Sequence, residues 1–242
     1  MKQLILAAAV LAAFSASAYA EETSFNAAVT SDYRYRGISQ TRLKSALQGG
    51  VDYINNPTGL YAGAWASTIK WTRDAGGGGN VELDIYGGKR GQITTDVSYD
   101  VGVLSYVYPD NRLKRASGFA NADTTEIYGQ VGYGPATLKY SHSLTNLFGF
   151  VDSKNSGYLD LSADIDAGNG FIVNLHAGHQ RVHNSSVANC TDWKAGVTRD
   201  LGFASLQLAA VGTNASKTVY ASPANGKFLG KNALQLTLSR TF

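Results

Sequence analysis

The chain ends in "LQLTLSRTF" (Leu234–Phe242), an alternating segment that closes on an aromatic residue. Three leucines take every second position and polar residues fill the positions between them, which is the period-two pattern of a β-strand with one apolar face. A soluble β-sandwich strand alternates in the same way, with its apolar side in a protein core. The orientation of the apolar face must therefore come from the rest of the chain.

Upstream of this segment the same alternation recurs, as in "VELDI", where Val81, Leu83 and Ile85 share one face and Glu82 and Asp84 the other. About twelve such segments are expected in all, and most have about ten or eleven residues, close to what a tilted strand needs to cross a bilayer. We place them at 24–36, 44–54, 60–72, 80–90, 95–108, 124–134, 136–147, 157–166, 170–181, 190–200, 203–213 and 231–242.

The connections between these segments alternate strictly between long and short. The long ones are 37–43, 73–79, 109–123, 148–156, 182–189 and 214–230, and the short ones are 55–59, 91–94, 134–135, 167–169 and 201–202. A soluble sandwich has no reason to collect every long loop at one end. Outer-membrane barrels have short periplasmic turns and longer external loops, so the rhythm favours a membrane barrel.

Both ends of the chain agree with export. Lys2, the apolar run 4–14 and the closing "AYA" at 18–20 form the layout of a cleaved secretory signal peptide, so we assign 1–20 to the signal and 21–242 to the barrel. The terminal Phe242 resembles the signature that bacterial outer-membrane proteins present to the barrel assembly machinery, which becomes an expected partner. The predicted location is the bacterial outer membrane.

These features predict an all-β fold: a transmembrane, antiparallel, up-and-down β-barrel of about twelve strands. Apolar side chains face lipid and polar ones face the lumen, and closure leaves no unpaired backbone group in hydrocarbon, where each would cost several kcal/mol. The 27 glycines and 14 tyrosines suit such a chain, and the single cysteine, Cys190, forms no internal disulfide. A formal charge of only +3 excludes nucleic acid as an expected partner.

"SDYRYRGISQT" (31–41) alternates tyrosine with arginine at the end of the first predicted strand. If the parity of Phe25 continues, Tyr33 and Tyr35 lie on the lipid face at the outer rim, where aromatic girdles sit. Arg34 and Arg36 then turn into the mouth of the pore.

This motif, together with "LQGGVDY", "GLYAGAWAS" and "ELDIYGG", resembles the opening of the TorF family of porin-like bacterial outer-membrane proteins. The resemblance extends from about Phe25 to Phe242. It implies a porin-like barrel in a Gram-negative bacterium, and it implies no catalytic residue and no particular solute.

Charged residues at inward parity indicate what the lumen selects. The candidate pore-lining residues are Arg34, Arg36, Glu82, Asp84, Arg90, Asp96, Asp100, Glu126, Lys139, Asp160, Asp164 and Lys194. Carboxylates predominate, so we expect a narrow, mildly cation-preferring channel for passive passage of small solutes. Twelve strands lie between filled eight-stranded barrels and open porins, which leaves a non-conducting structural or adhesion barrel as the alternative. Basic outer loops are expected to meet outer-membrane lipid and lipopolysaccharide.

Enzymatic and metal chemistry find little support. Ser143 is adjacent to His142 in "YSHSLTN", so the two side chains point to opposite faces of a strand, and an envelope lipid hydrolase is the least favoured alternative. The odd separation of His176 and His179 likewise argues against a metal pair. We expect no catalytic residue, no metal and no cofactor.

Overall fold

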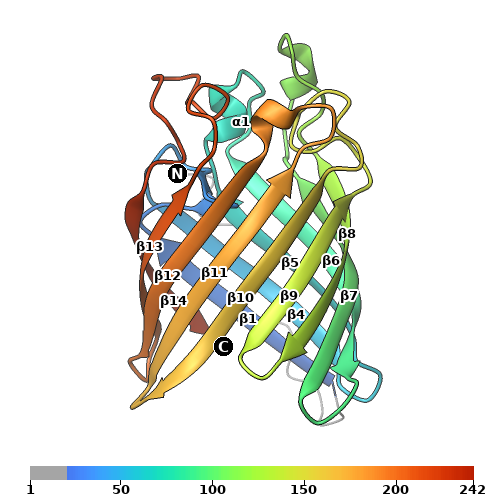
Figure 1. Ribbon diagram of the computed structural model, residues 1–242, viewed down its shortest axis with the longest axis vertical. Coiled ribbons are helices and arrows are strands. Elements are labelled where there is room, and N and C mark those ends of the chain that lie inside the picture. Colours follow the sequence, from blue (N-terminus) through green and yellow to red (C-terminus); the bar gives the residue numbers. More distant parts are fainter. Residues whose placement is uncertain (1–20) are drawn as a thin grey trace, which may run out of the picture.

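A computed structural model describes residues 21–242, so the predicted signal peptide at 1–20 lies outside the described residues. Twelve strands close into one antiparallel barrel, in which each strand pairs with its neighbours along the chain and the first pairs with the last (Figure 1). The barrel strands are β1 (Glu21–Thr30), β4 (Ala46–Asn55), β5 (Leu60–Thr68), β6 (Val81–Gln92), β7 (Val97–Val107), β8 (Thr124–Tyr133), β9 (Ala136–Ser143), β10 (Gly157–Gly168), β11 (Phe171–Arg181), β12 (Cys190–Asp200), β13 (Ser205–Thr213) and β14 (Ala233–Thr241).

The barrel closes where the two ends of the chain meet. β1 pairs with β14, with Thr30 opposite Thr237, and the backbones of Phe25 and Phe242 exchange hydrogen bonds of 3.2 and 2.8 Å. On its other side β1 pairs with β4, with Thr30 opposite Ala46. The predicted all-β, antiparallel, twelve-stranded barrel is confirmed, and closure removes the sheet edges that hydrocarbon does not tolerate.

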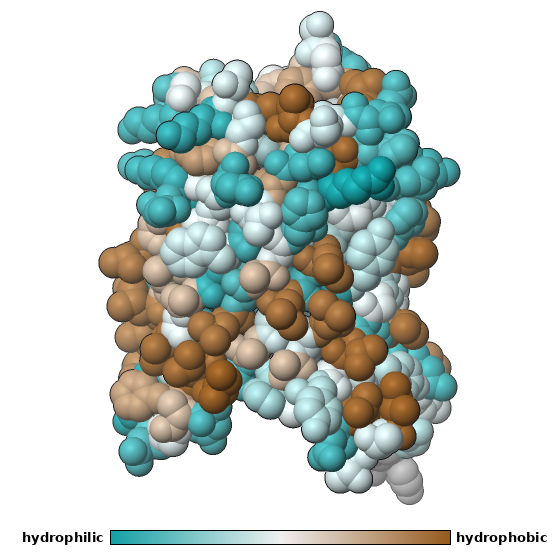
Figure 2. Space-filling view, in the orientation of Figure 1, coloured by the Kyte–Doolittle hydropathy of each residue, from teal (hydrophilic) through white to brown (hydrophobic). Residues whose placement is uncertain are grey.

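The two faces of the barrel wall differ in chemistry, as the alternation predicts. Outward side chains such as Ile85, Leu161 and Leu208 are 52 %, 55 % and 51 % exposed, whereas inward Glu82 and Glu126 are 2 % and 1 % exposed. Figure 2 shows apolar side chains over the wall below a hydrophilic upper end. The chain is therefore apolar outside and polar inside, the reverse of a soluble protein.

The two ends of the barrel also differ. The loops L1 (31–45), L2 (69–80), L3 (108–123), L4 (144–156), L5 (182–189) and L6 (214–232) gather at one end, the long-loop end, which is uppermost in Figure 1. Tight turns occupy the other, the short-turn end. L2 contains the short helix α1 (Trp71–Asp74), and L1 contains the strands β2 (Arg34–Tyr35) and β3 (Ile38–Ser39). The predicted alternation of long and short connections is confirmed.

Among residues 21–242, no helix is long and apolar enough to cross a membrane.

The first strand ends at Thr30, six residues before the predicted end of its segment. The backbone N–H of Ser31 still donates to the carbonyl of Leu236 at 2.8 Å, but the N–H of Leu236 donates to the hydroxyl of Ser31 at 3.0 Å. The amide of Gln235 then donates to the carbonyl of Asp32 at 2.7 Å. The ladder between β1 and β14 ends at these two side-chain bonds, so the parity of β1 does not continue. The prediction that Tyr33 and Tyr35 face lipid is wrong: both lie inside the barrel.

Candidate functional site: a hairpin across the lumen

L1 folds inward as a two-residue hairpin, called here the L1 hairpin (residues 34–39), in which Arg34 pairs with Ser39 and Tyr35 with Ile38. Its turn residues, Arg36 and Gly37, have φ angles of 47° and 79°. Positive φ at both positions is typical of a type I′ turn, which favours Asn-Gly. Arginine is an unfavourable residue at the first position, so its side chain must have a use that offsets the strain.

Asp32 fixes the base of the L1 hairpin. Its carboxylate accepts hydrogen bonds from Arg34 Nε at 2.6 Å, from Ser39 Oγ at 2.5 Å and from Thr41 Oγ1 at 3.1 Å. Arg34 also donates to the carbonyl of Leu229 in L6 at 2.9 Å. The outer residues of the "SDYRYRGISQT" motif therefore hold one another, which explains why charged and hydroxyl side chains recur in it.

The two tyrosines of the hairpin bind the barrel wall on one side. Tyr33 donates to Glu82 on β6 at 2.5 Å, and the hydroxyls of Tyr35 and Tyr106 on β7 are 2.5 Å apart. Burial and the negative charge of Glu82 raise the pKa of Tyr33 well above its usual value, so its hydroxyl stays a donor. Lipid would offer these two hydroxyls no hydrogen-bond partners. The inward fold of L1 gives each of them one.

Arg36 reaches across the lumen to the opposite wall. Its guanidinium donates to Glu126 on β8 at 2.7 Å and to Gln180 on β11 at 2.5 Å, and it lies 4.3 Å from the ring centre of Tyr158 on β10. Burial lowers the pKa of Arg36, but the carboxylate of Glu126 outweighs that effect and the pKa lies well above its usual value. The arginine is therefore a permanent positive charge bound to three strands, which is the use that offsets the strain of its turn position.

Gly37 lets the tip of the hairpin contact the wall between β12 and β13. A Cβ atom at this position would lie 2.7 Å from the Cβ of Asp192 and 2.9 Å from the Cβ of Thr213. Both distances are shorter than van der Waals contact, and the φ of 79° already disfavours a side chain. Only glycine fits both requirements.

We predict that Gly37→Ala loosens the hairpin without unfolding the barrel. The left-handed backbone alone costs about 1–2 kcal/mol for a residue with a Cβ, and the clash adds to it. Trypsin should then cut after Arg34 or Arg36, which mass spectrometry identifies, while heat-modifiable migration on gels reports an intact barrel. Gly129→Ala is the matched control, because a Cβ there meets nothing within 4 Å. Equal protection of both variants would contradict the prediction.

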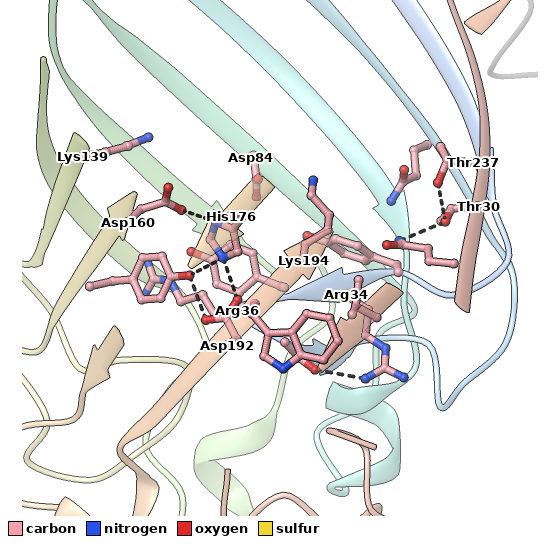
Figure 3. A pocket seen from close by; sticks show the side chains of 18 of the residues that line it. Thr30, Arg34, Arg36, Asp84, Lys139, Asp160, His176, Asp192, Lys194 and Thr237 are labelled. Carbon is pink, nitrogen blue, oxygen red and sulfur yellow. Dashed lines mark hydrogen bonds and ion pairs between the residues drawn. The ribbon is translucent and has the colours of Figure 1, made fainter. Parts of the chain in front are cut away.

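Two cavities meet at the L1 hairpin. The lumen cavity, about 540 Å³, is enclosed by the strands, and the outer cavity, about 170 Å³, is enclosed mostly by L1, L2, L3, L4 and L6. Tyr35 and Arg36 line both cavities, so the hairpin is the partition between them. Figure 3 shows the charged residues of the lumen cavity around Arg36. A solute that moved between these two cavities would pass these two side chains.

Most of the predicted pore-lining residues on the barrel strands point inward. The lumen cavity is lined by Asp84, Lys139, Asp160 and Lys194 from the strands, and by Arg34 and Arg36, which reach it through the inward fold of L1 and not through the parity of β1. Glu82 and Glu126 point inward but are occupied by the L1 hairpin. Nearer the short-turn end, Asp100 accepts from Tyr61, Arg90 lies over the ring of Tyr61, and Asp164 accepts from Asn174.

Asp96 is the exception among the predicted pore-lining residues. The structure places it in the exposed turn between β6 and β7, ahead of the first residue of β7, Val97. The predicted strand began two residues too early, and parity has no meaning in a turn. Asp96 is therefore at the rim of the short-turn end and not on the lumen wall.

His176 is a lumen residue that the sequence pattern did not single out as functional. It lies between two carboxylates, 3.1 Å from Asp160 and 2.8 Å from Asp192, and Tyr158 also donates to Asp192 at 2.9 Å. The even spacing of Asp192 and Lys194, and the register that sets His176 opposite Lys194, could have indicated a shared face. The pairing of β10, β11 and β12 was needed to join the three.

The candidate hydrolase pair does not form. Ser141 and Ser143 are buried inside the barrel, whereas His142 lies with the ring of Tyr140 on the outer face, the two ring centres 6.3 Å apart. His179 likewise faces out and hydrogen-bonds Thr191, away from His176. In the part of the chain that the structure describes, no group of three or more His, Cys, Asp or Glu side chains is arranged to hold a metal ion.

Comparisons with solved structures show the fold. The barrel is similar to the KdgM porin, described in complex with disordered oligogalacturonate, with a TM-score of 0.55, 4 % identity, and 91 % of this chain and 97 % of that chain covered. It is also similar to the NanC porin, with a TM-score of 0.56, 8 % identity, and 91 % and 98 % covered. LpxR from Salmonella typhimurium matches at a TM-score of 0.46 and 12 % identity, over 90 % and 99 % of the two chains.

No curated protein matches the chain. A family model described as a bacterial protein of unknown function, Gcw_chp, matches residues 13–242. The likeness to the TorF family stays a prediction. Since the matched segment contains all twelve barrel strands and the L1 hairpin, the chain belongs to the Gcw_chp family, and its barrel has the fold of outer-membrane porins.

Proposed function

We propose that the protein is a porin-like channel of the bacterial outer membrane, in which the L1 hairpin forms the constriction. The observation that carries this proposal is the meeting of the lumen cavity and the outer cavity at Tyr35 and Arg36. A barrel that served only as a scaffold needs no cavity of about 540 Å³, lined by charged side chains, behind its loops. The size of this cavity and the partition above it fit water, ions and small solutes better than polymers.

The charges of the lumen support a mild preference for cations. Inward carboxylates are Asp52, Glu82, Asp84, Asp100, Glu126, Asp160, Asp164 and Asp192, and inward basic residues are Arg34, Arg36, Arg90, Lys139 and Lys194. The surplus is negative, which attracts cations through the summed field. It also argues against a polyanion such as the oligogalacturonate of the KdgM complex as the solute.

Planar-bilayer recording of the purified protein tests the proposal. We expect discrete conductance steps and, under a salt gradient, a reversal potential of the sign that cation preference gives. Absence of steps, both in the wild type and after the L1 hairpin is removed, would end the channel proposal. Anion preference would leave a channel but overturn its selectivity.

Single charge removals should move the selectivity in opposite directions. Asp164 is exposed to solvent near the short-turn end, so Asp164→Asn should lower the cation-to-anion permeability ratio by about a factor of two, because few exposed charges set the field. Lys194→Gln, on the wall of the lumen cavity, should raise it. Lys227→Gln is the matched control, since Lys227 lies in the exposed tip of L6 and lines neither cavity. The same shift for all three variants would contradict the reasoning.

The position of the L1 hairpin in the lumen also supports the second candidate function, a non-conducting structural or adhesion barrel. If the L1 hairpin never leaves the lumen, the protein is a closed wall whose loops act outside, and recording then shows steps only after the hairpin is removed. The loops do present exposed basic residues, among them Arg73, Arg112, Lys114 and Arg115. Contact of these residues with lipopolysaccharide, and recognition of Phe242 by the assembly machinery, stay predictions.

A further inference from the structure

The outer cavity is lined by aromatic side chains that come from five separate loop regions. They include Trp71, Tyr108, Phe119, Phe148, Phe150 and Tyr220. Its walls join two apolar clusters, one around Leu113 and one around Leu147, with Phe148 packed against both. Loops that only needed to stick together would close this space, because buried apolar groups gain free energy from contact. Instead they enclose a cavity of about 170 Å³.

The volume and the lining define the size of an occupant. An apolar cavity of about 150 Å³ holds one benzene molecule, so about 170 Å³ fits one ring with a small substituent. Aromatic walls favour a flat ring over a flexible chain, since rings pack edge to face with a further gain beyond burial. Phe150 and Tyr220 already pack in this way, with ring centres 6.3 Å apart.

The polar groups of the outer cavity define the chemistry of the substituent. Among residues 21–242, no Asp or Glu lines it, and its one charged side chain is Arg36, which Glu126 neutralises. A charged ligand would therefore gain no free counter-charge. The indole N–H of Trp71 has no hydrogen-bond partner among the described residues, but its nitrogen is fully buried and does not open onto the cavity, so it sets no requirement on the substituent.

The cavity is joined to the constriction through Phe148. This residue has a φ of 44°, a conformation that bulky side chains rarely adopt. Its ring packs on Tyr35 of the L1 hairpin at 5.5 Å and on Tyr106 at 5.0 Å, so the strained backbone aims the ring at the partition. An occupant of the cavity would touch both Phe148 and Tyr35, and a solute that moved between the two cavities would pass Tyr35.

From these observations we propose that the outer cavity is a binding site for a small, uncharged, single-ring aromatic compound. The proposal that the compound binds depends on the cavity alone. The role of the cavity as an entry site for a transported solute rests on the proposed channel function.

The test is ¹⁹F NMR of 4-fluoroacetophenone with the protein in lipid nanodiscs, and empty nanodiscs measure partition into lipid. We expect saturable line broadening with the wild type that exceeds the partition baseline. Val219→Trp, which fills the cavity from L6, should remove it, and Ala221→Phe is a second filling variant. Val187→Trp is the matched control, because Val187 is 68 % exposed in L5 and outside the lining. Heat-modifiable migration selects folded samples.

The requirement for an uncharged ligand is tested separately. 4-Fluorobenzoate keeps the fluorinated ring but carries a carboxylate that finds no free counter-charge in the lining, so it should bind several-fold more weakly than 4-fluoroacetophenone. No broadening beyond the lipid baseline, or equal binding by the wild type and both filling variants, would overturn the proposal. If the protein binds the compound but never conducts, the binding site stands and the channel function fails. If it conducts but does not bind the compound, the channel function stands and the binding site fails.

Discussion

Replacing residues 32–41 with a short glycine-serine linker should raise the single-channel conductance several-fold. The L1 hairpin is the partition between the lumen cavity and the outer cavity, and its removal joins them into one water-filled path. The barrel should survive, because Thr30 and Ala46 are paired neighbours on β1 and β4 and a short turn suffices to join the strands. Planar-bilayer recording measures the step size, and heat-modifiable migration confirms folding.

The matched control removes loop residues that lie outside the lumen. Residues 224–227 form an exposed tip of L6 and line neither cavity, so their deletion should leave the conductance unchanged. If the linker variant folds and its step size equals that of the wild type, the hairpin is not the constriction. If both deletions raise the conductance equally, the long loops restrict the pore together, and the L1 hairpin alone is not the constriction.

Removing the anion that holds Arg36 should have the second large effect. In Glu126→Gln the buried guanidinium of Arg36 loses the carboxylate that it binds, and breaking one side of a buried ion pair costs about 3–5 kcal/mol. The wall of the barrel has many backbone bonds and the hairpin has few. We therefore expect the strain to be relieved by the hairpin leaving the lumen, which lets trypsin cut after Arg34 and Arg36 and adds a larger open state to bilayer traces.

A double-mutant cycle separates loss of the pair from loss of either side chain. Arg36→Met with Glu126→Gln leaves no uncompensated charge, so cleavage after Arg34, the hairpin site that all the variants keep, should be slower in the double variant than in Glu126→Gln alone. The second oxygen of Glu126 is buried without a partner among the described residues, so the pair is not fully satisfied even in the wild type. Additive effects of the two substitutions would show that the pair does not hold the hairpin.

Much of the barrel could be predicted because its signals are local. Val81 and Glu82 point to opposite faces through strand geometry alone, and each of the twelve segments repeats that information independently. An error in one segment, such as the start of the strand after Asp96, does not affect the others. The rhythm of long and short connections is equally local, and it distinguished the barrel from a sandwich before any contact between strands was known.

The position of the L1 hairpin was harder to predict from the sequence than the barrel strands were. The parity that correctly oriented Asp160 and Lys194 failed at Tyr33, because parity holds only while the strand continues. Nothing near Tyr33 in the sequence announces that the strand ends at Thr30. The bonds that end it come from Gln235 and Leu236, about two hundred residues away in the chain but adjacent once the barrel closes.

The amino-acid sequence by itself therefore determined the wall: the number of strands, which side chains face outward and which end carries the long loops, since each depends on residues close together in the chain. Only the tertiary structure decided what crosses the lumen. Arg36 finds Glu126 and Gln180, 90 and 144 positions away, and such a contact exists only after all the intervening strands have paired. The outcome is a buried charge that needs a partner, and the closed barrel brings that partner within reach.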